Sequence, residues 1–200
     1  MAGEWLRIDE YTDVLASTDL LAVIGPRLNS SPFDWKWMIL AAHNGVQGAF
    51  VCAIQDSSGT NILKQQSAAE MLNWLSTLEG ERPEEQLADF RMLVKKYRNM
   101  YPAALAPEQH RKIIKLHREF RNKFAHFTPT HWSIEISTMP SLIENAIDLI
   151  ETAMQQDQVM LRTSGNFKRR LSGNLAAARA ALVLSKTRGA NRTRTSASID

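Results

Sequence analysis

Three side chains that could take part in catalysis lie within six residues of one another, at Arg121, Asn122 and His126. A histidine can transfer a proton near neutral pH, and an arginine can stabilise negative charge on a phosphoryl group. On an ideal helix, five residues of separation turn Arg121 and His126 apart by about 140°. They cannot meet on one straight helical face. Either the helix loosens near His126, or the pair acts together with a second copy of itself.

The helix expected to carry these residues covers 107–127. Proline is favoured near the first helical position, here Pro107, and the acidic Glu108 suits the positive end of the helix dipole. Arg118 continues the four-residue spacing of Asn122 and His126, which predicts a polar flank. The apolar residues recur at intervals of three and four, which predicts a buried stripe of Ile113, Leu116, Phe120, Phe124 and Phe127.

The segment 121–126 resembles the Arg-Asn-x-x-x-His motif of the HEPN superfamily (higher eukaryotes and prokaryotes nucleotide-binding), in a bacterial branch. The segment 126–137, followed by a new helix, is similar to the loop and last core helix of that branch. The segment 35–54, with His43, Asn44 and Gln47, is also similar to it. The resemblance covers residues 30 to 155. It implies an all-α, HEPN-like helical bundle with a short extended segment after the motif and a basic C-terminal helix or tail.

HEPN ribonucleases are typically dimers whose two motifs line one cleft, so the resemblance implies a homodimer. It also implies a metal-independent endoribonuclease without a cofactor, in which the 2′-hydroxyl of RNA attacks the adjacent phosphate. The products are a cyclic phosphate and a free 5′-hydroxyl. The resemblance assigns general acid or base work to His126, phosphate stabilisation to Arg121 and orientation to Asn122. A toxin or defence effector, restrained by an antitoxin or regulatory protein, is the biological role it suggests.

Two other interpretations of the motif stay open. In the first, the chain is a non-catalytic HEPN module that dimerises and binds nucleotide, RNA or a protein partner. In the second, the residues are structural: Arg121 pairs with an acid such as Glu144, Asn122 caps a turn, and His126 closes the helix end, where a cation is favoured.

Five further residues are candidates for substrate binding. His43 and Gln47 are four apart on one face of the expected helix 35–54, where they either line the pocket of the motif or form hydrogen bonds within the core. Arg118 and Lys123 are cations that flank the motif. His131, with Trp132 beside it, could stack on a base, although a tryptophan at this place could instead anchor the core.

The net charge is only +3, but its distribution is uneven. Residues 107–131 include six basic and two acidic side chains, and residues 158–199 include nine basic and no acidic ones. Positive charge therefore gathers around the motif, which suits the RNA partner that the resemblance implies. The C-terminal segment either collects polyanions by releasing their counterions or serves only as a solubilising tail. A DNA-binding helical protein led by this segment is a third interpretation of the chain.

Apolar stripes and helix start signals predict the remaining elements. Ser31 and Pro32 mark the start of the helix 35–54, which is apolar nearly all round and suits a central position in a bundle. Disorder is expected from Lys186. The chain is divided into a HEPN-like helical domain, 1–160, and a basic C-terminal helix with a disordered tail, 161–200. The other expected elements are helices over 66–78, from Pro83 to about 98, from Ser137 or Thr138 to about 160 and over 167–185, with an extended segment at 132–136.

Composition and spacing argue against an internal disulfide, a membrane span and a metal site. The single cysteine, Cys52, cannot form an internal disulfide and is expected in the core. The N-terminus lacks the pattern of a signal peptide, and the longest apolar run, 37–42, is well short of the ~20 residues that cross a bilayer. A cytoplasmic protein without a membrane span is expected. His110 and His117 have no third ligand at suitable spacing, so no metal site is expected.

Overall fold

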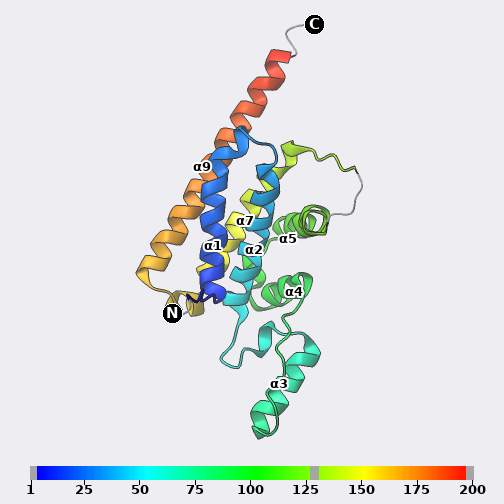
Figure 1. Ribbon diagram of the computed structural model, residues 1–200, viewed down its shortest axis with the longest axis vertical. Coiled ribbons are helices and arrows are strands. Elements are labelled where there is room, and N and C mark those ends of the chain that lie inside the picture. Colours follow the sequence, from blue (N-terminus) through cyan, green and yellow to red (C-terminus); the bar gives the residue numbers. More distant parts are fainter. Residues whose placement is uncertain (1–3, 127–130, 197–200) are drawn as a thin grey trace.

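A computed structural model describes residues 4–126 and 131–196, and side chains as far as residue 185. Apart from one isolated bridge, all regular structure in these ranges is helical, which confirms the expected all-α class. Four long helices, α1, α2, α7 and α9, form the body, with α4 and α5 beside them and α3 projecting at one end (Figure 1). The helices are α1 (Glu10–Ile24), η1 (Gly25–Asn29), α2 (Asp34–Ile54), η2 (Thr60–Ile62), α3 (Gln65–Thr77), α4 (Phe90–Met100), η3 (Pro102–Ala104), α5 (Pro107–Lys115), η4 (Leu116–Arg121), α6 (Asn122–Ala125), η5 (Ile136–Thr138), α7 (Met139–Met154), α8 (Asp157–Arg162) and α9 (Gly165–Ser196).

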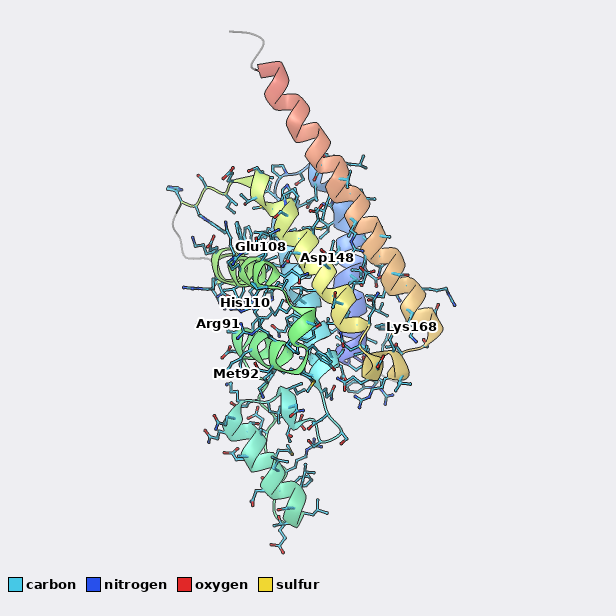
Figure 2. The ribbon with its side chains drawn as sticks, turned by 180° about the vertical axis from the view of Figure 1, so that it is seen from behind. Arg91, Met92, Glu108, His110, Asp148 and Lys168 are labelled. Carbon is cyan, nitrogen blue, oxygen red and sulfur yellow. The ribbon has the colours of Figure 1, made fainter. Side chains whose placement is uncertain are left out.

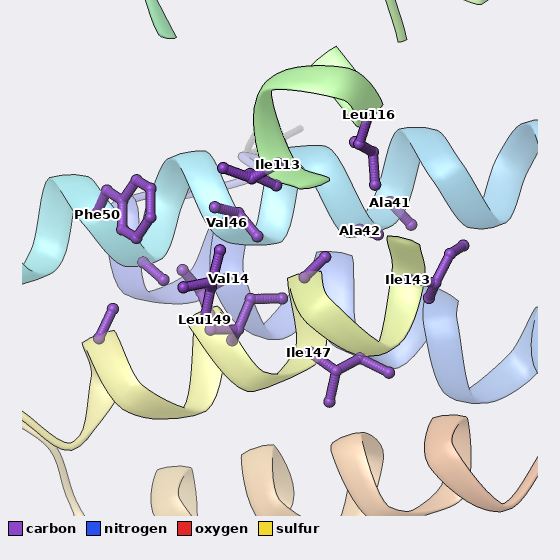
Figure 3. Close-up of a cluster of buried hydrophobic side chains, with 14 of the residues drawn as sticks. Val14, Ala41, Ala42, Val46, Phe50, Ile113, Leu116, Ile143, Ile147 and Leu149 are labelled. Carbon is purple, nitrogen blue, oxygen red and sulfur yellow. The ribbon is translucent and has the colours of Figure 1, made fainter. Parts of the chain in front are cut away.

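The central element is α2, in the position that its apolar composition predicts. Figure 3 shows Val46 and Phe50 of α2 packed with Val14 of α1 and Leu149 of α7, and Ile113 of α5 on another side of α2. Two glycines permit this close packing: a Cβ atom would lie 2.8 Å from Ile150 Cδ1 at Gly45, and 2.8 Å from Val14 Cγ2 at Gly48. Within the described ranges, α2 is also the one helix long and apolar enough to cross a membrane, but 78% of its apolar window is buried in the bundle.

The C-terminal helix α9 lies against α1 and α7. Its predicted stripe is buried, and its backbone stays helical to Ser196 rather than ending near residue 185. Arg170 forms an ion pair with Asp19 of α1. Arg179 binds Asp148 at 2.8 Å and Glu151 at 2.6 Å on α7. Part of the basic charge of this segment is therefore neutralised by the bundle itself; the end of the expected tail, 197–200, lies outside the described residues.

The helix expected from Pro83 begins later, at Phe90. The chain before it pairs with the segment after η2: the N–H of Lys64 donates to the carbonyl of Gln86 at 2.8 Å, and the N–H of Ala88 donates to that of Ile62 at 2.9 Å. Backbone groups used in this way cannot form helical hydrogen bonds. Asp89 then caps α4 by accepting from the N–H of Met92 at 2.9 Å.

The projecting helix α3 spans nearly the residues predicted for it, but its apolar side is not core. In α3 only Ser67 and Met71 are buried. Its apolar residues Leu72 and Leu75 are 53% and 41% exposed, because the helix stands away from the bundle (Figure 1).

The motif segment starts at Pro107, as predicted, but it is not one regular helix. After α5, the turn η4 widens to a π-helix, in which the N–H of Asn122 donates to the carbonyl of His117, five residues earlier. The short α6 ends at Ala125, and His126 leaves the helix with φ −120° and ψ 62°. The even spacing expected for Arg118, Asn122 and His126 is therefore broken on both sides of α6.

The helix after the motif begins close to its predicted start, with Pro140 in its first turn. Residues 131–135 form no regular element and lead into η5. The single helix expected to about residue 160 is divided, because α7 ends at Met154 and α8 begins at Asp157. Residues 127–130, including Pro129 and the last residue of the predicted stripe, Phe127, lie outside the described residues.

Candidate nucleic-acid interface

A histidine pair, with His43 buried and His117 half-buried, joins α2 to η4. The Nε2 atom of His43 lies 2.9 Å from the Nδ1 atom of His117, and the rings stack with centroids 5.1 Å apart. The ring of Phe90, at the start of α4, lies 4.2 Å from the His43 ring and 4.7 Å from the His117 ring. His43 is fully buried. The pair therefore ties the π-turn to the core and to α4.

Both histidines of the pair are held neutral. Burial, followed by the charges of His117 and Arg121, lowers the pKa of His43 to about 3. Burial and then the charge of Arg121 also lower the pKa of His117, and Asp89 opposes this shift. Among the described residues, the buried Nδ1 of His43 has no hydrogen-bond partner. One of the two histidines donates to the other, and the tautomer decides which.

Arg121 and Asn122 lie where η4 passes into α6. The Nη1 atom of Arg121 donates a hydrogen bond to Oδ1 of Asn122 at 3.2 Å, and both residues are half-buried. The charge of Arg121 lowers the pKa of both paired histidines, which means that its guanidinium lies near them. The structure therefore brings Arg121, Asn122, His43 and His117 into one neighbourhood.

His126, the third residue of the motif, is exposed at the end of α6. Its N–H completes the last turn by donating to the carbonyl of Asn122 at 2.9 Å. The helix thus loosens at His126, as one of the two geometric possibilities requires. An exposed imidazole at a helix end is accessible to a substrate and to a second copy of the chain.

A groove with a strong excess of positive charge runs between α4 and α5 and on to α6. Its first part, of about 420 Å³, and its second, of about 470 Å³, share His110 and Ile114 and so adjoin. Asp89 and Glu119 are the acidic residues of its lining. We call this feature the basic groove; its cations are Arg91, Lys95 and Arg98 from α4 and Arg111, Lys115, Arg118 and Lys123 from the motif segment.

Figure 2 shows the two walls of the first part of the groove, with Arg91 and Met92 on α4 and His110 on the neighbouring α5. Burial, and then the charge of Arg98, lower the pKa of His110. Lys115 lies 3.9 Å from Glu119, and Arg111 forms an ion pair with Glu108, in both cases on the surface. Exposed pairs of this kind are weak and rearrange easily, so these cations can also bind phosphates.

A second hollow, of about 340 Å³, lies on another side of α6. Phe124 and Trp132 form part of its wall, with ring centroids 4.9 Å apart. The ammonium group of Lys123 lies 4.9 Å from the centroid of the Trp132 ring. We call this hollow the aromatic pocket; its other lining residues are Pro32, Phe33, Trp35, Lys36, Ile134, Ile136 and Met139.

The five candidate substrate-binding residues do not lie together in one feature. Arg118 and Lys123 line the basic groove. His43 is buried, so it can act on a ligand only through His117 or Arg121. Gln47 is half-buried one turn further along α2, and His131 is exposed on the irregular segment before η5. The structure therefore places three of the five, Arg118, Lys123 and His43, around the motif.

Sequence reasoning missed the α4 wall of the groove. It gave no part in binding to Arg91, Lys95 or Arg98. Their spacing of four and three was the available signal, because it places all three on one face. Lys96, between them, points elsewhere and donates to the carbonyls of Asn61 at 2.7 Å and Leu63 at 3.1 Å.

Other kinds of site have less support. Within 4–126 and 131–196, no group of three His, Cys, Asp or Glu side chains could hold a metal ion. Cys52 is fully buried, and burial raises the pKa of its thiol, so it is not a reactive nucleophile. Comparison of the chain with protein-family models, with curated proteins and with solved structures finds no match.

Proposed function

We propose that this protein is a metal-independent endoribonuclease of HEPN type, acting as a toxin or defence effector. The observation that carries the proposal is the place of the motif: Arg121 and Asn122 lie directly between Arg118 and Lys123, two cations of the basic groove. A groove with seven cations and two acidic residues suits the backbone of a polyanion. The motif would then lie beside the bound phosphates.

In the proposed reaction, the 2′-hydroxyl of RNA attacks the adjacent phosphorus and the bond to the 5′-oxygen breaks. Arg121 stabilises the charge that develops on the phosphoryl oxygens, and Asn122 orients the guanidinium through their 3.2 Å hydrogen bond. His126 takes the proton from the 2′-hydroxyl or returns one to the leaving oxygen. The cyclic phosphate and the free 5′-hydroxyl balance the reaction without water or a metal ion.

In this proposal a second copy of the chain completes the site, so that Arg121 of one chain acts together with His126 of the other. Arg121 is half-buried on one side of α6, whereas His126 is exposed beyond its end. A two-fold axis beside α6 would bring His126 of one chain near Arg121 of the other. The protein is therefore expected to be a homodimer, and a regulatory partner would act by covering the groove.

The first experiment compares the protein with Arg121→Ala and His126→Ala on total RNA in EDTA. Each substitution is expected to reduce cleavage by about 100-fold or more, because it removes phosphate stabilisation or proton transfer. Arg7→Ala, which removes an exposed cation far along the chain, is the matched control and should cleave normally. Equal cleavage by all four proteins would overturn the assignment.

Mixing the two inactive variants tests the shared site. If each site takes its arginine from one chain and its histidine from the other, half of the randomly exchanged dimers regain one of two sites, and about a quarter of the activity returns. If each chain holds a complete site, mixing restores nothing. Light scattering of the same samples gives the oligomeric state.

A non-catalytic binding module is the second candidate, because the same groove and pocket could hold RNA without cutting it. Of the two paired histidines, His43 is fully buried and His117 is half-buried, and the pKa of each is lowered, so neither is positioned as an exposed proton donor. This alternative predicts tight binding of RNA, no product at any pH, and unchanged affinity after His126→Ala.

A further inference from the structure

We infer that the aromatic pocket binds an unpaired nucleobase of the RNA whose phosphates occupy the basic groove. The inference rests on the proposed contact with RNA, and it adds the substrate class: single-stranded RNA with a base turned away from the backbone. Aromatic side chains hold unstacked bases in this way, because every base has a π-face. The pocket would therefore act as a specificity site next to the motif.

The shape and lining of the pocket suit a flat ring. Its volume of about 340 Å³ falls at the small end of the range for small-molecule sites. Trp35 and Met139 close its floor with 4% and 1% exposure, while Phe33 stands at its rim with 82% exposure. An exposed phenylalanine ring beside a buried floor presents a free face on which a base can stack.

Charge at the rim distinguishes a nucleotide from a purely apolar ligand. Lys36 lines the pocket, with its ammonium group 5.1 Å from the centroid of the Trp37 ring, and Lys123 lies over the Trp132 ring at 4.9 Å. None of the described residues that line the pocket is acidic. A base in the pocket would thus have the ammonium group of Lys123 near its sugar and phosphates, whereas an apolar peptide would gain nothing from it.

Lys123 also connects the pocket to the basic groove. It lines the second part of the groove and at the same time contacts Trp132. It lies one residue from Asn122 and two from Arg121 in the same short turn. A strand that follows the groove can therefore pass Lys123 and turn one base into the pocket while its phosphate stays beside the motif.

The binding experiment uses an eight-nucleotide 2′-O-methyl RNA, which cannot undergo 2′-hydroxyl attack, and an abasic strand of the same length. The protein is expected to bind the base-containing strand about tenfold more tightly than the abasic one. Phe33→Ala should abolish this preference without harm to the fold, because the side chain is 82% exposed. Trp132→Leu should also abolish the preference. Trp5→Leu, which removes an exposed tryptophan outside the pocket, should keep the preference.

Two results of these binding and mass measurements would overturn the inference. One is equal affinity of the unmodified protein for the two strands. The other is a change in solution mass with Phe33→Ala while the base preference stays intact, which would identify the pocket as a contact between two copies of the chain.

Because the probe cannot be cleaved, the outcome is independent of catalysis. Base-dependent binding without cleavage of natural RNA would refute the ribonuclease proposal and keep the pocket. Cleavage that is unchanged in rate and sequence preference by Phe33→Ala would refute the pocket and keep the ribonuclease.

Discussion

The basic groove and the aromatic pocket share the short α6 turn but are built in opposite ways. The groove is lined mainly by long cationic side chains from α4 and the motif segment. The pocket is lined mainly by rings and branched apolar side chains from the start of α2, from α6 and from the segment before α7. Charge attracts any polyanion, whereas rings discriminate between strands with and without free bases. If the protein binds RNA as proposed, affinity and selectivity reside on different sides of one turn.

Reversing charge in the groove should have the largest effect. Lys95→Glu with Lys115→Glu is expected to weaken RNA binding by about 100-fold and to make the dependence of affinity on salt less steep by about two units of slope. Arg7→Glu with Arg82→Glu changes net charge equally, outside the groove. Fluorescence anisotropy over a series of salt concentrations measures both quantities. If both double variants lose affinity equally, the groove is not the site.

Acidic pH should destabilise the fold through the histidine pair that supports both regions. In the unfolded chain these histidines titrate near pH 6.5, whereas their pKa values are lowered in the folded state. Below about pH 6.5 the unfolded state takes up protons that the folded state does not. The free energy of unfolding should then fall by about 1.4 kcal/mol per pH unit for each neutral histidine. For His43 the loss continues to about pH 3.

Denaturant titrations at pH 7.5 and pH 5.5 test this prediction. His43→Gln should lower stability at pH 7.5 and also flatten its dependence on pH, because one of the two shifted groups is gone. His131→Gln, on the exposed segment, should leave the pH dependence unchanged. If the free energy of unfolding changes equally with pH in the protein and in His43→Gln, protonation of the pair is not coupled to folding.

Lys123→Met tests whether Lys123 acts in the basic groove or in the aromatic pocket. The side chain lines the groove and contacts the pocket, so its charge is expected to support phosphate binding for base-containing and abasic strands alike. The affinities for the base-containing and the abasic strand should both fall by about threefold to fivefold, and the slope of log affinity against log salt concentration should become less steep by about one. Selective loss of the base-containing strand would instead assign Lys123 to the pocket.

The smallest effect is expected on the projecting helix. Leu72→Gln replaces an exposed leucine of α3, far from both regions (Figure 1). Stability should change by less than about 0.5 kcal/mol, and RNA affinity should stay the same. A large loss of stability or of RNA affinity would show that α3 has a partner in solution and forms a third functional region.

Sequence patterns predicted the helices that bury a stripe over several turns. The positions of α2, α7 and α9 follow from their apolar spacing, because burial of that spacing is what stabilises them. The start of α4 could not be predicted in the same way. Its preceding residues pair with a segment more than twenty positions earlier, and no local signal records such pairing.

The candidate site was predictable in its residue types and not in its geometry. The motif and the surrounding charge are visible in the chain, whereas the contact between His43 and His117 joins residues 74 apart. The π-turn was equally hidden, because its wider hydrogen bond depends on packing against α2 and α4 rather than on helix propensity. The neutral state of the pair follows from that packing as well.

The π-turn also gives the motif segment a tolerance to changes in length that the core helices lack. A π-turn contains one residue more than an α-turn, so loss of the exposed Glu119 would let η4 close as an ordinary helix, with α5 and α6 still in place. The same loss within α2 would rotate every later residue by about 100° and expose the core. Evolution could therefore insert or remove a residue beside the motif, and so re-aim Arg121, without rebuilding the bundle.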